Sequence, residues 1–251
     1  YSVKLYSCMH KRGQLTIFII IAIFIVGAVL IFFLYQKNFQ FGALSPDAER
    51  VYNFVQSCIE QESLETIYQV GQNGGYFFPP NLSTESGVPI YYENGQNNMP
   101  SKEQVEDEIS FYMNQKLFFC TRNFVDFPDL EINQSEINTK TIIQDEKVVL
   151  NVNYPITIIK DSDKTLIKDF KFDVPVRMGI VYDSAEEFMR QQINQESICL
   201  SCMLEISEKN DLFVDMLDYD DETVVFIFRD ENSKIKDETF VWIFANKYEI
   251  I

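Results

Sequence analysis

The chain contains 251 residues, of which 46% are hydrophobic and 14% aromatic, so it can build a folded core and is not a disordered protein. Its 38 acidic residues outnumber 21 lysines and arginines and give a formal net charge of −17. This charge argues against a nucleic-acid-binding protein, because such proteins cluster basic residues. We expect an acidic, solvated surface, with binding of cations or of a basic partner as the alternative.

An uninterrupted apolar run, Leu15–Leu34, dominates the N-terminal part of the chain. It has the length of a bilayer-spanning helix, about 20 residues. We therefore predict a basic cytoplasmic leader at residues 1–14, a transmembrane helix at residues 15–35 and a linker at residues 36–44. Basic residues gather on the N-terminal side, so the remainder of the chain should lie outside the cytoplasm. A cleavable secretory signal is the alternative, but its apolar core is shorter and ends in small residues.

Residues Lys11–Thr16, at the start of this run, resemble the class III signal peptide of archaeal pilin-like proteins. In that family a peptidase cuts after the glycine and the apolar helix stays on the mature protein, which implies a processing site between Gly13 and Gln14. The resemblance implies a pilin-like subunit that assembles through its apolar helix. Phe18 stands where pilins carry an early glutamate, and this difference favours a simple membrane anchor.

A helical subdomain is expected at residues 45–127. Its first helix should begin at Pro46, the first helical position after a serine cap, and end near Gly71. The second helix should begin after Ser101, whose spacing to Gln104 matches a capping box. Both helices carry apolar residues at helical spacing, so we expect each to bury one face.

The loop between these helices is rich in glycine, proline and aromatic residues, and it contains a predicted short strand at residues 88–92. Its aromatic side chains would either close the core beneath the loop, which we favour, or form an exposed contact surface. These residues are Tyr76, Phe77, Phe78, Tyr91 and Tyr92.

Three segments of this region, Val55–Glu60, Gly71–Pro80 and Val88–Ile109, are followed by a closing cysteine. Together with the basic leader and the apolar run, they resemble uncharacterised membrane-anchored proteins of DPANN-type archaea. The resemblance extends to about Met178. It implies a membrane anchor and an external domain, and it implies no particular activity.

Residues 128–251 are predicted to form a mainly β subdomain with one or two helices. Apolar and polar residues alternate in seven segments, typical of strands: 130–133, 137–143, 148–159, 166–176, 212–217, 224–229 and 239–245. A helix is expected to be capped at Asp183–Glu186 and to run to about Glu196, with a continuation through Leu204 as an option. Runs of helices and of strands with short turns predict an α+β fold with a mainly antiparallel sheet.

Four of the five cysteines lie in the predicted external region, where disulfides persist. Cys58 and Cys120 fall on the apolar stripes of the two predicted helices, so we predict a disulfide between them; free core cysteines and half of a metal site are the alternatives. Cys199 and Cys202 form a CxxC pair, for which we favour a small disulfide. A zinc site shared with Cys58 and Cys120, or redox catalysis, would also fit this spacing.

The residues give little sign of catalysis. The single histidine, His10, lies in the leader, so we expect no enzyme, no cofactor and no metal in the external region. Asn81 and Asn133 match the N-glycosylation acceptor pattern. An acidic group between two predicted strands favours a solvated turn over a calcium loop. This group consists of Asp215, Asp218, Asp220, Asp221 and Glu222.

The sequence therefore predicts a single-span, cell-surface-anchored protein with a non-catalytic binding or scaffolding domain. Its expected partners are the lipid bilayer and another surface protein or a second copy of the chain, and not nucleic acid. The alternative is the pilin-like subunit, and a surface enzyme is the third hypothesis.

Overall fold

The computed structural model describes residues 21, 25–27, 44–193, 195 and 198–248. The predicted leader and the expected processing site at Gly13 and Gln14 lie outside these residues, as do most of the predicted transmembrane helix and linker. No helix in the described part of the chain is both long and apolar enough to cross a membrane. Residues Pro46–Ile251 form one compact unit.

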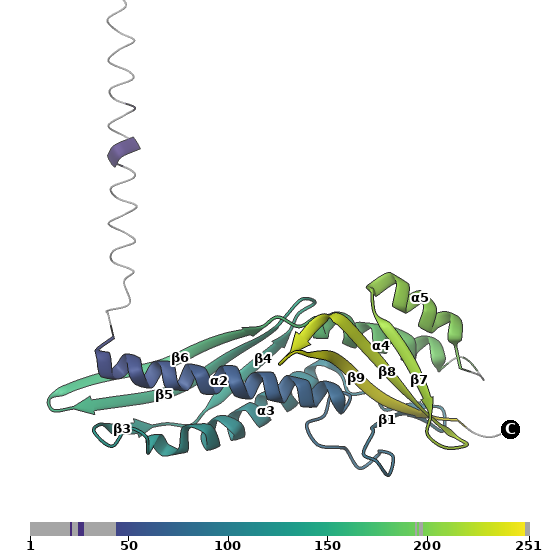
Figure 1. Cartoon of the computed structure of the whole chain (residues 1–251), viewed down its shortest axis with the longest axis horizontal. Coiled ribbons are helices and arrows are strands. Elements are labelled where there is room, and N and C mark those ends of the chain that lie inside the picture. The colour runs from purple at the N-terminus through teal and green to yellow at the C-terminus, as the bar shows by residue number, and fades with distance from the viewer. Residues whose placement is uncertain (1–20, 22–24, 28–43, 194, 196–197, 249–251) are drawn as a thin grey trace, which may run out of the picture. The chain divides into compact units, whose positions relative to one another are not determined.

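This unit has the predicted α+β fold, with two mainly antiparallel sheets rather than one (Figure 1). Its helices are α2 (Pro46–Gln72), α3 (Lys102–Thr121), the 3-10 helix η1 (Arg122–Phe124), α4 (Met178–Gln192) and α5 (Leu200–Asn210). The first begins at Pro46, as predicted. At the start of α3, the Gln104 amide donates to Ser101 Oγ (3.2 Å) and the Ser101 amide donates to Gln104 Oε1 (2.8 Å), which confirms the predicted capping box.

The first sheet is built around one long central strand. Its members are β3 (Glu131–Gln134), β4 (Asn138–Ile143), β5 (Val148–Lys160) and β6 (Asp163–Val174). Strand β6 pairs along one side of β5, while β3 and β4 lie end to end along the other side. All these pairings are antiparallel, as expected for strands joined by short turns.

The second sheet has the strand order β2-β1-β9-β8-β7. Its members are β1 (Ile90–Glu93), β2 (Gln96–Asn97), β7 (Phe213–Asp218), β8 (Thr223–Ile235) and β9 (Glu238–Lys247). Only the β1–β9 pairing is parallel among the described strands, and it brings the loop after α2 to the end of the chain. The two subdomains expected from the sequence therefore share this sheet.

The helix expected to be capped at Asp183–Glu186 begins earlier, at Met178. Apolar side chains at Met178, Val181 and Tyr182 are buried and extend the stripe by more than one turn, so packing decides where the helix starts. Ser184 lies inside the helix and its hydroxyl donates to the Ile180 carbonyl (2.7 Å). The predicted cap is therefore wrong.

The inner face of the second sheet forms the aromatic core of the unit. Phe188 of α4 lies 4.8 Å from Phe226, 6.0 Å from Phe228 and 6.2 Å from Phe244, measured between ring centroids. All four side chains are fully buried. Each such ring contributes about 1.5–3 kcal/mol through burial.

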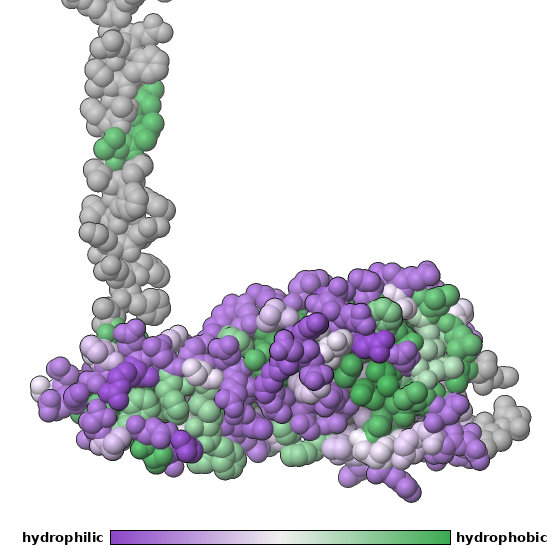
Figure 2. All heavy atoms as spheres, viewed as in Figure 1, coloured by the Kyte–Doolittle hydropathy of each residue, from purple (hydrophilic) through white to green (hydrophobic). Residues whose placement is uncertain are grey.

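The outer face of the same sheet carries fewer aromatic side chains and is partly exposed. Register places Phe213, Asp215 and Leu217 of β7 on one face with Ile227 of β8 and Ile243 of β9. Figure 2 shows apolar residues gathered on the surface over β7, β8 and β9. The two faces therefore differ in how completely they are covered.

One buried ion pair joins three elements near the start of α4. Arg177 Nη1 donates to Asp230 Oδ1 of β8 (2.9 Å), and Arg177 Nη2 donates to the Asn210 carbonyl at the end of α5 (2.6 Å). Ser233 Oγ donates to the other carboxylate oxygen of Asp230 (2.5 Å). Asp230 is fully buried, so these partners compensate the loss of its hydration.

Candidate functional site

Helix α3 lies along the outer edge of β4 and is joined to it by a row of side chains. Glu106, Ser110 and Asn114 accept hydrogen bonds from the backbone amides of residues 143, 141 and 139, at 2.8, 3.0 and 2.9 Å. Residues four apart on a helix rise about 6 Å, and alternate residues on a strand rise about 6.7 Å, so the two repeats match. These side chains satisfy strand amides that would otherwise be free to pair with another chain.

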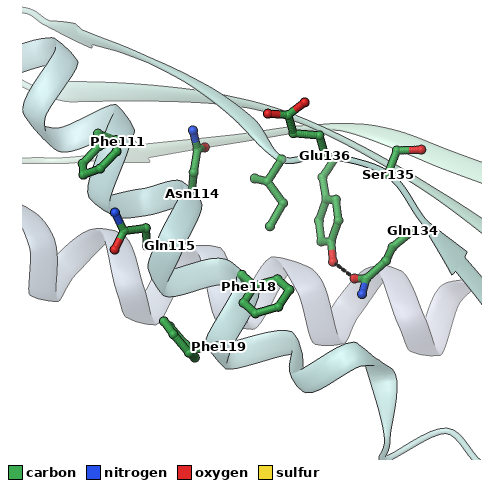
Figure 3. Close-up of a pocket in the computed structure, with 10 residues that line it drawn as sticks. Phe111, Asn114, Gln115, Phe118, Phe119, Gln134, Ser135 and Glu136 are labelled. Atoms are coloured by element: carbon green, nitrogen blue, oxygen red, sulfur yellow. Dashed lines mark hydrogen bonds between the residues drawn. The ribbon is translucent and has the colours of Figure 1, made fainter.

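A groove opens where this row of polar side chains ends. The next residue in the four-residue repeat is Phe118, which cannot accept a hydrogen bond, and β4 gives way to the segment 135–137 that connects it to β3. The groove has a volume of about 700 Å³ (Figure 3). It is lined by Phe111, Asn114, Gln115, Phe118, Phe119, Gln134, Ser135, Glu136, Ile137 and Tyr154.

Three phenylalanines make the groove unusual for a solvated surface. Phe111 is 55% exposed, Phe118 50% and Phe119 70%. Phe118 and Phe119 contact each other edge to face, with ring centroids 5.6 Å apart. Large apolar side chains gathered on a surface mark interaction sites more often than chance placement does.

Polar groups on the sheet side of the groove are linked to each other. Tyr154 Oη donates to Gln134 Oε1, and Gln134 Nε2 donates to Asn123 Oδ1. Burial raises the pKa of Tyr154, and its hydrogen bond with Thr121 opposes that rise, so the hydroxyl stays protonated at neutral pH. The groove thus offers aromatic rings, amides, hydroxyls and one carboxylate, Glu136, a set suited to binding a partner.

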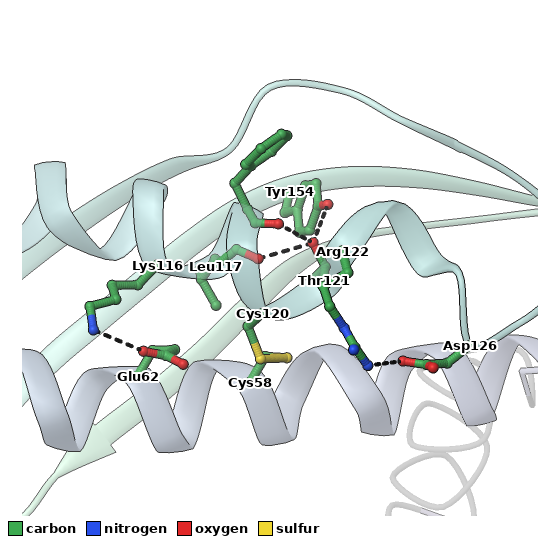
Figure 4. Close-up of a disulfide and its surroundings, with 10 residues drawn as sticks. Cys58, Glu62, Lys116, Leu117, Cys120, Thr121, Arg122, Asp126 and Tyr154 are labelled. Carbon is green, nitrogen blue, oxygen red and sulfur yellow. Dashed lines mark hydrogen bonds and ion pairs between the residues drawn. A yellow bond between two sulfur atoms is a disulfide. The ribbon is translucent and has the colours of Figure 1, made fainter.

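A disulfide between Cys58 and Cys120 fixes α3 beside α2 (Figure 4). The two Cα atoms are 5.9 Å apart, and the helices run antiparallel, so Glu62 and Lys116 form an ion pair one turn further along (3.8 Å). This is the pairing predicted from the helical spacing. Because Cys120 lies within two residues of Phe118, the bridge also holds the helix end that forms the groove.

The other cysteine pair also forms a disulfide. Cys199 and Cys202 have their Cα atoms 5.2 Å apart and both are buried. The two cysteines lie at the start of α5. Cys199 is the N-cap residue of this helix, and its Sγ accepts a hydrogen bond from the Cys202 amide (3.3 Å). The described residues contain no group of three or more His, Cys, Asp or Glu side chains placed to hold a metal ion.

The aromatic loop after α2 is divided between core and surface. Phe77 and Tyr91 are buried, and Tyr91 Oη donates to the Gly74 carbonyl (2.6 Å). Tyr76 and Tyr92 are half-buried, and Phe78 is 59% exposed. The favoured interpretation, burial beneath the loop, therefore holds for two of the five side chains and partly for two more.

The structure divides the predicted acidic group: Asp215 and Asp218 lie in β7, and Asp220, Asp221 and Glu222 lie in the turn to β8. Asp220 Oδ1 accepts from the backbone amides of Glu222 (2.9 Å) and Thr223 (2.7 Å). These bonds hold the pKa of Asp220 below its usual value. The two glycosylation acceptors, Asn81 and Asn133, are exposed.

No protein-family model, curated protein or solved structure matches the chain. The groove is therefore interpreted from its own chemistry. Sequence reasoning did not single out its residues, although one signal was present: Phe111 and Phe118 are seven residues apart on a helix face outside the apolar stripe.

Proposed function

We propose that the chain is a single-span surface protein whose external domain binds a partner protein through the groove beside α3. The observation that carries this proposal is the group of half-exposed phenylalanines around the groove. Full burial of a phenylalanine side chain contributes about 1.5–3 kcal/mol, and these rings are 50–70% exposed, so a partner that covers two of them gains roughly the value of one full burial and needs the polar contacts of the groove as well. The apolar run Leu15–Leu34 supports the membrane anchor.

The partner is expected to present an apolar side chain flanked by hydrogen-bonding groups. Phe118 and Phe119 would cover the apolar part, while Gln115 and Gln134 supply amide donors and acceptors at the rim. Because the disulfide holds α3, this surface is formed before the partner arrives, and little conformational entropy is lost on binding. The role is non-catalytic binding or scaffolding at the cell surface.

Site-specific photo-crosslinking in native cells tests the groove. A photoreactive residue at Gln115 should give one discrete adduct, and Phe118→Ser should abolish it, because that change removes an exposed ring without opening the core. The same residue placed at Lys168, 56% exposed on β6, is the control. An adduct that persists in Phe118→Ser, or that forms equally from Lys168, would contradict groove binding.

Membrane topology is tested separately. Protease added to intact cells should digest residues 45–251, and protection until lysis would contradict an external domain.

N-terminal sequencing separates the anchor from the pilin-like alternative. A mature start at Gln14, together with filaments that contain the chain, would favour the pilin-like subunit.

A further inference from the structure

Five strands lie at the outer edges of the two sheets among the described residues, because β3 and β4 share one side of β5, and four of them are protected against pairing with another chain. Strand β3 is only four residues long. Helix α3 covers the β4 edge through its row of side chains. Strand β2 contains two residues, too few to guide a partner strand. Strand β6 is protected by charge, because it carries three exposed lysines, Lys164, Lys168 and Lys171.

The fifth edge strand, β7, has none of these protections. It pairs with β8 over all six residues in continuous register. In the described part of the chain, no backbone hydrogen bond reaches its outer side. It contains no lysine and no proline, and its apolar side chains are open to solvent: Phe213 is 49% exposed, Met216 41% and Leu217 57%.

The residue pattern of β7 defines what would fit beside it. The strand reads apolar, apolar, acidic, twice over, from Phe213 to Asp218. Asp215 lies between Phe213 and Leu217 on the outer face, and Arg229 contacts both Asp215 (3.3 Å) and the Phe213 ring (5.2 Å). Residues directly opposite each other on paired strands interact most strongly, so a complementary strand would read apolar, apolar, basic.

We propose that the outer edge of β7 is a second binding surface, which accepts an added β-strand with this apolar-apolar-basic pattern from a partner protein. Main-chain hydrogen bonds would supply the affinity and alternate side chains the specificity. Side chains of the added strand would extend the partly exposed outer face of the sheet, where Ile227 and Ile243 already lie side by side. A second copy of the chain fits less well, because each copy would bring Asp215, Asp218 and the acidic turn to the joint.

The test uses the full chain purified in mild detergent and a fluorescent, end-capped peptide of two valines and one lysine, repeated twice and flanked by serines. Fluorescence anisotropy should show saturable binding. Leu217→Lys should weaken it about tenfold, because a lysine on an edge strand opposes pairing and repels the basic probe. The matched control is Leu166→Lys on β6, which makes the same chemical change at a side chain 58% exposed and should leave binding unchanged.

Two further peptides keep the proposal falsifiable if Leu217→Lys alters the fold. A peptide with glutamates in place of lysines, and a peptide with alternate backbone nitrogens methylated, should both bind the unaltered chain at least tenfold more weakly. Equal binding of the methylated peptide, or no binding of the lysine peptide, would overturn the proposal. Concentration-dependent dimers that Leu217→Lys abolishes and Leu166→Lys preserves would overturn it in favour of pairing between two copies.

Discussion

Strands β4 and β7 are both six residues long and both lie at the outside of a sheet, yet their surroundings are opposite. Every second residue of β4 is buried, and its outer amides bond to α3. Strand β7 is exposed along nearly its whole length, although its side chains are more apolar. For these two strands, the presence of a neighbouring helix, and not the apolar character of the strand, decides which edge is covered.

The largest expected effect concerns the buried Arg177–Asp230 ion pair, because Asp230 lies in β8, the strand that pairs with β7. Asp230→Asn should lower the free energy of unfolding by about 3–5 kcal/mol, because it leaves the Arg177 guanidinium buried without its counter-ion. Chemical denaturation measures the loss. Asp215→Asn is the control, since its pair with Arg229 is exposed and should contribute less than about 1 kcal/mol. Equal losses in the two variants would contradict a special role for the buried pair.

The β4 edge is covered by α3, and the Cys58–Cys120 disulfide holds that helix in place. Replacing Cys58 and Cys120 by serine should cost about 2–4 kcal/mol, because the bridge closes a loop between residues 62 positions apart. Replacing Cys199 and Cys202 should cost less, since those residues are only three positions apart. Denaturation of the two double variants under matched conditions checks the order, and a reversed order would contradict it.

A smaller change should open the β4 edge without unfolding it. Asn114→Ala leaves the Thr139 amide without its partner and should cost about 1–2 kcal/mol. Hydrogen exchange at Thr139 should accelerate. Gln115→Ala, an exposed neighbour on the same helix, should stay within about 0.5 kcal/mol and leave that exchange rate unchanged. Unaltered exchange in Asn114→Ala would show that α3 does not protect this edge.

The smallest expected effect is a dependence of the β7–β8 turn on pH. The pKa of Asp220 is lowered in the folded state by the backbone amides it accepts, so its contribution to stability is present above the unfolded value of about 3.9 and is lost as pH falls below it. Asp220→Ala should therefore lower stability at pH 6 and have less effect near pH 3. An equal effect at both pH values would show that the ionised carboxylate is not what holds the turn.

The sequence predicted the features that depend on neighbours along the chain. The capping box at Ser101 and the strand segments follow local rules of spacing and alternation. The Cys58–Cys120 pairing also followed, because both residues lie on apolar stripes of consecutive helices. Features that depend on distant partners could not be predicted in this way.

The start of α4 shows why. Its buried first turn is defined by packing, while Asp183–Glu186 imitates a cap in local sequence. The groove was missed for a related reason, since half of its lining comes from β3, β5 and the segment 135–137 between β3 and β4, whose positions depend on strand pairing. The sheet shared by the two expected subdomains likewise depends on β1 pairing with β9, a contact between residues 90 and 245.

The Cys58–Cys120 bridge also has a mechanical consequence. If the proposed anchor holds the chain at its N-terminus and a partner pulls at Phe118, tension enters α2 at Pro46, crosses the disulfide and reaches the groove two residues further on. The intervening residues, which would span roughly 200 Å when stretched, carry none of this load. In a tethered protein of this design, a pull on the partner would be carried by α2, the disulfide and the end of α3, and the sheets would stay outside the path of the load.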